Sequence, residues 1–204
     1  MSRLVATVGL VLGAVLTVVG AATIAWETGV SADPDRTAAA AATATPVPRI
    51  GFRDAPQVQT RAGQSFVVDV MVYDVTDLFG WQVDLTCNKE FLRFDGADKG
   101  PFLGEDGTGT YYAPPVTYAT ATTTWVRRAA ETRLAVDMGA TGTGAIARVS
   151  WTALKPAPAG TTLSIAARKL VDRNAQDLAV SYASSGNLKV VIGAWGVDLP
   201  YVRR

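Results

Sequence analysis

The sequence predicts an all-β sandwich for residues 49–193, with two sheets packed around one core. Many short apolar segments follow one another at fairly even spacing, and glycine, proline and small polar residues separate them. No sequence segment after residue 49 shows the periodicity of a helix that buries one face. Short strands without helices are typical of two sheets packed face to face.

Residues 63–95 organise the predicted fold, because they contain three strand patterns joined by two compact turns. Within residues 66–73 the apolar side chains occupy both alternating positions, which is typical of a strand covered on both faces. Within residues 81–87 the pattern becomes strictly alternating, so we expect one face in the core and the other in solvent. The inward positions are Trp81, Val83, Leu85 and Cys87, and the outward positions are Gln82, Asp84 and Thr86.

Residues 139–153 predict a second alternating strand. Its first glycines permit positive φ and therefore a tight turn before the strand begins. The inward positions are Ala147, Val149, Trp151 and Ala153, and the outward positions are Arg148, Ser150 and Thr152. We expect the core of the sandwich to contain Trp81, Val83, Leu85, Leu134, Val136, Val149 and Trp151.

The remaining predicted strands are shorter. A first strand is expected within residues 49–60, and others follow at residues 91–94 and 110–112. Residues 125–128 and 134–138 predict a hairpin whose turn is residues 129–132. The segments that continue and close the sheets are residues 162–167, 169–171, 178–182 and 188–192.

Residues 1–32 predict an export element ahead of the domain. Arg3 precedes an uncharged apolar run at residues 4–26, which as a helix is long enough to cross the roughly 30 Å hydrocarbon core of a membrane. Two interpretations stay open: a signal peptide cleaved after the small residues 30–32, or an uncleaved membrane anchor. Either one places the domain outside the cytoplasm, secreted or anchored, with membrane contact only through this segment. Residues 33–48, rich in Ala, Thr and Pro, predict a disordered linker, and residues 194–204 a short tail.

Composition excludes several classes of function. The sequence has 19 basic and 18 acidic residues, so no strong field favours nucleic acid or an anionic membrane as a partner. Histidine is absent from the sequence, which removes the commonest general base and the commonest metal ligand. Cys87 is the only cysteine and occupies an inward position, so we expect a small buried hydrophobe rather than a disulfide, a zinc ligand or a nucleophile.

Four sequence pieces in order carry a family resemblance. They are DVTDLFGWQ at residues 74–82, FLRFDG at 91–96, GPFLG at 100–104, and the glycine-rich turn into the strand at 139–153. Together they resemble the cohesin domain, the module of cellulosome scaffolds that binds dockerin modules, over residues 56–192. The resemblance implies a jelly-roll sandwich of about nine strands and a non-catalytic protein-binding function in an extracellular or cell-surface assembly, with a link to polysaccharide degradation. Cys87, Asn88 and Lys89 stand where many family members have an aromatic-Asp-Pro turn, so we expect this turn and the surface beside it to differ from those of the family.

The resemblance also implies where a dockerin-type partner would bind. In the family the partner lies on one flat sheet face, and two strands of this chain offer outward positions that resemble the family's binding strands. These positions are Gln82, Asp84, Thr86, Arg148, Ser150 and Thr152, with Arg148 as the best anchor. The alternative function is carbohydrate binding, in which aromatic rings form a flat platform for sugar rings. The residues for that platform are Tyr111, Tyr112, Tyr118 and Trp125.

Metal binding and catalysis have weaker sequence support. Asp172, Asn174 and Asp177 have oxygen atoms at spacings similar to a calcium loop, but the pattern is incomplete, and the sequence favours a polar hairpin turn. We therefore expect no cofactor, with calcium as the open alternative. Asp84 and Asp137 are the candidates for a glycosidase pair of carboxylates, but single acidic residues on solvent-facing strands are usually surface residues. The sequence favours a binding module over an enzyme.

Overall fold

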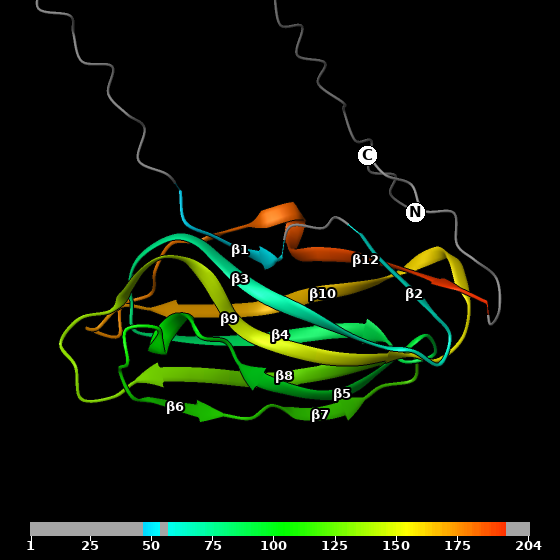
Figure 1. The fold of residues 1–204 in the computed structure, drawn as a ribbon, viewed down its shortest axis with the longest axis horizontal. Coiled ribbons are helices and arrows are strands. Elements are labelled where there is room, and N and C mark those ends of the chain that lie inside the picture. The colour runs from blue at the N-terminus through cyan, green and yellow to red at the C-terminus, as the bar shows by residue number, and fades with distance from the viewer. Residues whose placement is uncertain (1–46, 54–56, 195–204) are drawn as a thin grey trace, which may run out of the picture. The chain divides into compact units, whose positions relative to one another are not determined.

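The computed structural model of the protein describes residues 47–53 and 57–194. These residues form two β-sheets packed face to face, and two single-turn 3-10 helices, η1 (Phe102–Gly104) and η2 (Ala183–Gly186), connect strands (Figure 1). The predicted all-β sandwich is confirmed. The described part contains twelve strands, where the resemblance implied about nine.

One sheet has five strands in the order β11-β1-β3-β9-β5. Its long central strands, β3 and β9, pair antiparallel and place Val68 opposite Val149. The predicted strand at residues 139–153 is confirmed as β9. The five strands are β1 (Arg49–Phe52), β3 (Ser65–Leu78), β5 (Leu92–Lys99), β9 (Ala140–Ala153) and β11 (Ser181–Tyr182).

The other sheet has seven strands. Six follow the order β2-β12-β10-β4-β8-β6, and β7 also pairs with β8, along the same side as β6. This edge, formed by β6 and β7, is the lowest part of the domain in Figure 1. The strands are β2 (Gln57–Arg61), β4 (Gly80–Asn88), β6 (Thr110–Ala113), β7 (Val116–Ala119), β8 (Thr123–Arg133), β10 (Ala157–Val171) and β12 (Asn187–Gly193).

The core lies between the two sheets and is built from the inward positions of their central strands. Trp151 is fully buried, and its ring meets the ring of Phe94 edge to face with 5.5 Å between centroids. Five of the seven predicted core residues are buried as expected: Trp81, Val83, Leu85, Val149 and Trp151. Burial at these positions fixes the outward direction of the residues between them.

The prediction for residues 125–138 was wrong. β8 continues without interruption to Arg133, because the residues expected to form a turn pair with β4, with Ala130 opposite Gln82 and Thr132 opposite Gly80. The strand expected at residues 134–138 is a loop. Leu134 is therefore 48% exposed and Val136 is half-buried, so neither belongs to the core.

Three other strand predictions differ from the structure. Residues 162–167 and 169–171 belong to one strand, β10, in which a bulge between Ile165 and Ala167 resets the alternation. Within residues 178–182 only Ser181 and Tyr182 form a strand, β11. β7 was not predicted, because its sequence follows two prolines in a segment rich in threonine and glycine.

The first two strands belong to different sheets. β1 pairs antiparallel with β3 and parallel with β11, whereas β2 pairs parallel with β12 in the other sheet. Both N-terminal strands thus lie beside strands from the end of the domain.

The predicted export element at residues 1–32, most of the linker at 33–48 and nearly all of the tail at 194–204 lie outside the described residues. In the part of the chain that is described, no helix has the length and apolar character needed to cross a membrane.

Candidate binding faces

The six outward positions predicted to form one binding face lie in two different sheets. Gln82, Asp84 and Thr86 belong to β4 in the seven-stranded sheet. Arg148, Ser150 and Thr152 belong to β9 in the five-stranded sheet. Since both sets point away from the shared core, they lie on opposite outer faces of the sandwich. The prediction of one continuous face was wrong, because alternation shows which side chains point outward but not which sheet a strand joins.

On the outer face of β9 the charged groups pair with one another. Arg148 donates from Nε to Oδ1 of Asp69 at 3.0 Å, and Nη2 of Arg53 lies 3.1 Å from Oδ2 of the same carboxylate. The hydrogen bond to Asp69 raises the pKa of Arg148 above its ordinary value. Thr152 is nearly buried and donates to Asp95 at 2.5 Å, while Ser150 is half-buried. Arg148 is therefore part of a local ion-pair group.

On the outer face of β4, Asp84 is a buried structural residue. Its carboxylate accepts hydrogen bonds from Arg127 Nε to Oδ2 and from the backbone N–H of Arg128 to Oδ1, both at 2.9 Å. The β4–β8 register shifts at this point, and Arg128 has a positive φ of 63°. The bulge in β8 covers Asp84, which is only 3% exposed. The prediction that the Asp84 carboxylate faces solvent was therefore wrong. The hydrogen bond from Arg127 to Asp84 raises the pKa of Arg127 above its ordinary value.

A shallow hollow of about 340 Å³ lies on this outer face, over the neighbouring strands β10, β4, β8 and β6. Small side chains at Gly80, Ala113 and Ala130 leave the space, and Tyr111, which is 61% exposed, lines it from β6. Its lining residues are Gly80, Trp81, Gln82, Tyr111, Ala113, Ala130, Glu131, Thr132, Lys169, Val171 and Ala175. We call these residues the Tyr111 hollow.

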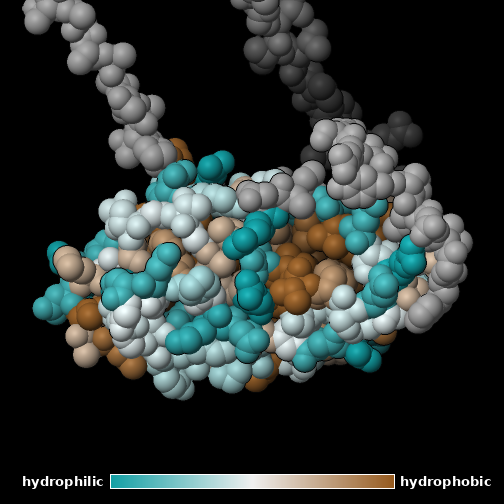
Figure 2. All heavy atoms as spheres, in the orientation of Figure 1, coloured by the Kyte–Doolittle hydropathy of each residue, from teal (hydrophilic) through white to brown (hydrophobic). Residues whose placement is uncertain are grey.

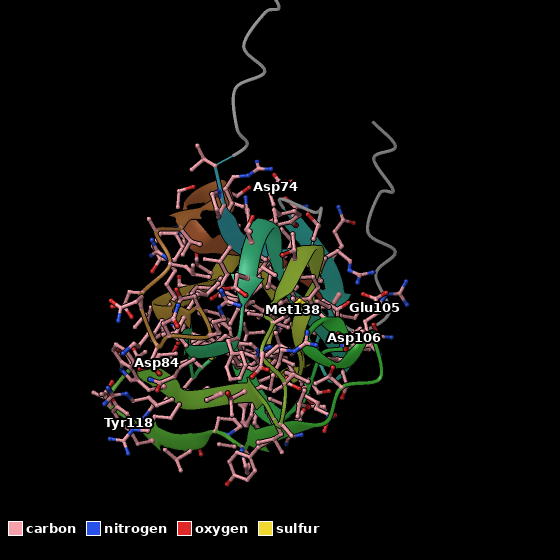
Figure 3. The ribbon with its side chains drawn as sticks, turned by 90° about the vertical axis from the view of Figure 1, so that its left-hand side faces the viewer. Asp74, Asp84, Glu105, Asp106, Tyr118 and Met138 are labelled. Carbon is pink, nitrogen blue, oxygen red and sulfur yellow. The ribbon has the colours of Figure 1, made fainter. Side chains whose placement is uncertain are left out.

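Two of the four predicted platform residues form a parallel ring pair. Tyr118 of β7 lies directly across from Trp125 of β8, with 5.9 Å between ring centroids and 3° between ring planes. The guanidinium of Arg127 lies 5.9 Å from the centre of the Tyr118 ring. Figure 3 shows Tyr118 and Asp84 on the same side of the sandwich.

Tyr112 does not belong to that platform. It occupies an inward position of β6, donates a hydrogen bond to the backbone oxygen of Ala97 at 3.0 Å, and packs near Trp81. Burial raises the pKa of Tyr112 to about 12. Because Tyr111 and Tyr112 are consecutive in one strand, only Tyr111 can face outward.

The calcium-like segment forms a polar turn. Oδ1 of Asp172 accepts the backbone N–H groups of Asn174 and Gln176, each at 2.8 Å, and Asp177 lies 3.6 Å from Nζ of Lys169. Within residues 47–53 and 57–194, no three His, Cys, Asp or Glu side chains are grouped as metal ligands would be. Asp137 lies in the loop after β8 and not on a sheet face with Asp84.

A second apolar hollow, of about 560 Å³, opens between β3 and the β2–β12 pair. Figure 2 shows hydrophobic surface on this side, bordered by hydrophilic side chains. Its apolar lining residues are Val58, Val67, Val68 and Leu188. It forms because β1 covers the edge of β3 only from Val70 to Tyr73.

Sequence reasoning missed Arg127 and Lys169 as outer-face residues. Arg127 and Arg128 are consecutive charged residues inside an otherwise alternating strand, and that break in alternation is the signal of a bulge. Lys169 follows the bulge in β10, which shifts its position relative to the residues before it.

Comparison with known proteins identifies the fold. No protein-family model matches the chain, and no curated protein matches it. A non-cellulosomal cohesin from the archaeon Archaeoglobus fulgidus is similar with a TM-score of 0.51 and 12% identity, covering 74% of this chain and 94% of that one. The sixth cohesin of Acetivibrio cellulolyticus scaffoldin B, solved in complex with a mutant Cel5 dockerin, has a TM-score of 0.53 and 14% identity, covering 72% of this chain and 100% of that one.

A cohesin module from a Clostridium perfringens family 33 glycoside hydrolase is similar with a TM-score of 0.54 and 9% identity, covering 72% of this chain and 98% of that one. The chain therefore has the cohesin fold, and the jelly-roll sandwich implied by the resemblance is confirmed.

Proposed function

We propose that this chain is a non-catalytic protein-binding module that takes a dockerin-type partner on the outer face of its seven-stranded sheet. The Tyr111 hollow carries the proposal. The hollow combines apolar space with the exposed aromatic side chain of Tyr111. The side chains of Gln82 and Lys169 add groups that can form hydrogen bonds with a partner. Similar solved cohesins in complex with dockerins support the partner class.

Side-chain chemistry favours this face over the outer face of β9. Tyrosine, tryptophan and arginine supply most of the strong anchors at protein interfaces. Tyr111, Tyr118 and Trp125 all lie on the seven-stranded sheet. On the β9 face, Arg148 and Arg53 are instead bound to Asp69. A partner there would have to break these pairs before it could use the charges.

The chemistry of the chain supports a binding role over an enzymatic one. The sequence contains no histidine. Burial raises the pKa of the only thiol, Cys87, to about 12, which suppresses the thiolate needed for nucleophilic attack. Asp84 is engaged by two donors and is not free to act as a base.

We extend the proposal to location. The uncharged apolar run at residues 4–26 after Arg3 supports export of the domain, either secreted or anchored to the membrane. An extracellular or cell-surface assembly is the setting that a dockerin-type partner implies. A link to polysaccharide degradation would come through the enzyme attached to that partner.

The parallel pair Tyr118–Trp125 favours carbohydrate binding as the second candidate function. Parallel rings on a sheet face offer a surface on which a sugar ring can stack. This function would use β7 and β8 and would not need the Tyr111 hollow.

The deciding experiment measures binding of the full chain to purified dockerin modules encoded in the same genome, and its retention on insoluble cellulose, xylan and chitin. Tyr111→Ala and Lys169→Glu should weaken dockerin binding by about tenfold or more, as loss of an interface anchor does. Arg148→Glu, on the opposite face, is the matched control and should bind like the parent. Retention on polysaccharide that Trp125→Ala abolishes would establish the second function instead. Failure to bind any dockerin or polysaccharide would reject both.

A further inference from the structure

The outer edge of β7 is an unpaired strand edge. In the described residues β7 pairs with β8 on one side, and no strand lies on the other. All four residues of β7 are exposed. In Figure 1 this strand lies at the lower margin of the domain, with nothing beyond it. The edge therefore offers backbone groups to solvent or to another chain.

The hydrogen-bond pattern identifies which backbone groups are free. The N–H of Thr120 donates to the oxygen of Thr123 at 2.9 Å, so these two residues form a hydrogen-bonded pair at the end of the β7–β8 hairpin. In an antiparallel ladder such pairs alternate, which makes Tyr118–Trp125 and Val116–Arg127 the next ones. Thr117 and Ala119 therefore direct their N–H and C=O groups toward the open edge.

The edge also lacks the features that usually prevent strand pairing. Residues 110–126 contain no charged side chain, and β7 itself consists of Val, Thr, Tyr and Ala. Natural edge strands are commonly protected by charged residues, prolines or bulges. Pro114 and Pro115 precede β7 and leave Thr117 to Ala119 unprotected. In a contact between two identical chains any charge would meet its own copy, so an uncharged edge suits self-association.

We propose that two copies of this chain pair antiparallel through β7 about a two-fold axis at Tyr118. In this register Thr117 of each copy lies opposite Ala119 of the other, so the two free N–H and two free C=O groups of each copy all find partners. The two Tyr118 side chains then form a directly opposed cross-strand pair, and each continues into its own Trp125. The seven-stranded sheets join into one sheet with a row of four aromatic rings.

The contact is small, which sets its strength. Two four-residue strands bury less than the roughly 1,200 Å² at which stable interfaces begin. The dimer therefore forms at high concentration and dissociates on dilution. The Tyr111 hollow contains no residue of β7, so substitutions at Tyr111 or Lys169 test the proposed partner site without changing the β7 edge.

Sedimentation equilibrium of the full chain over a wide concentration range tests the proposal. The average mass should rise from monomer toward dimer in the parent protein. Thr117→Lys places one added charge on each copy, and the proposed register makes the two lysines diagonal neighbours on one face of the joined sheet, so it should weaken dimerisation by about tenfold or more. Gln57→Lys adds the same charge to an exposed residue of β2, on the opposite edge of the same sheet, and should dimerise like the parent. A mass that stays monomeric at every concentration, or equal dimerisation in both variants, overturns the proposal.

Hydrogen exchange of the parent protein provides a test that does not depend on any variant. The amides of Thr117 and Ala119 should exchange quickly in dilute solution and slow down as the concentration rises. The amide of Tyr118, already bonded to β8, should change little. Unchanged exchange at Thr117 and Ala119 while the mass doubles would place the contact elsewhere and reject the β7 pairing.

Discussion

Arg127 donates a hydrogen bond from Nε to Oδ2 of Asp84 at 2.9 Å, and this bond joins two neighbouring strands of the proposed binding sheet, β8 and β4, at a bulge. The other carboxylate oxygen accepts the backbone N–H of Arg128 at the same distance. One buried side chain thus satisfies a backbone donor that the bulge has released from the strand ladder. The guanidinium of Arg127 also lies against the Tyr118 ring. The bond to Asp84 therefore helps to hold Arg127 in its position beside that ring.

Replacing Asp84 should destabilise the fold. In Asp84→Ala the N–H of Arg128 and the guanidinium of Arg127 lose their buried acceptor, which should cost about 2–4 kcal/mol of unfolding free energy. Chemical denaturation monitored by tryptophan fluorescence measures the loss. Gln82→Ala, an exposed position on the same strand, should stay within about 0.5 kcal/mol of the parent. Equal stability of the two variants would show that the carboxylate is not structural.

Trp151→Ala should be the costlier core substitution. Its ring is fully buried and packs against Phe94, so truncation leaves a cavity and should cost about 3–5 kcal/mol. Leu134→Ala is the comparison, because Leu134 was expected in the core and instead lies half exposed in a loop. Its cost should be about 0.5 kcal/mol or less. A large loss at Leu134 would contradict the loop position.

Cys87 should not react in the folded protein. Burial raises the pKa of its thiol to about 12, so thiolate is nearly absent at pH 8. A chromogenic disulfide reagent should detect no thiol in native buffer and one thiol per chain after unfolding in guanidinium. Rapid reaction in native buffer would mean that the strand carrying Cys87 opens to solvent.

Arg133, the last residue of β8, donates a hydrogen bond from Nη2 to Oδ2 of Asp106, and this bond should make stability depend on pH in the acid range. The hydrogen bond from Arg133 lowers the pKa of Asp106 from its ordinary value of 3.8 to about 2. A lowered folded-state pKa stabilises the fold above the unfolded-state value, and the contribution is lost as pH falls through the folded-state value. The parent should therefore have a higher Tm than Asp106→Asn at pH 5, and the difference should shrink between about pH 4 and pH 2. A constant difference across that range would show that Asp106 does not titrate with folding.

Alternation in the sequence was enough to predict the core of the central strands. Trp81, Val83 and Leu85 are inward because every second residue of a strand shares a face. The same rule placed Arg148 and Gln82 outward but could not assign their strands to a sheet, since strand order depends on contacts between segments far apart in the chain.

Prediction from the local sequence also failed at positions where the alternation of inward and outward residues is interrupted. Asp84 was expected in solvent because the bulge that covers it belongs to another strand, β8. Nothing in the sequence indicates that Arg127 and Arg128 of β8 donate hydrogen bonds to a residue of β4. Leu134 was expected in a strand because it is apolar, although β8 ends one residue earlier. Tyr112 was grouped with Tyr111 by composition, and strand geometry separates them.

The pairing of β1 and β2 with strands from the end of the domain has a consequence for how the protein is made. Gln57 lies opposite Lys189, so almost the entire domain separates the two partners, and β2 has no strand neighbour other than β12 among the described residues. Bringing such distant segments together carries a large loop-closure entropy and makes folding slow. Hairpins such as β7–β8 can form while synthesis continues, whereas β2 has nothing to pair with until residue 193 has been added. β2, although it is the second strand in the sequence, is therefore among the last to be locked in place.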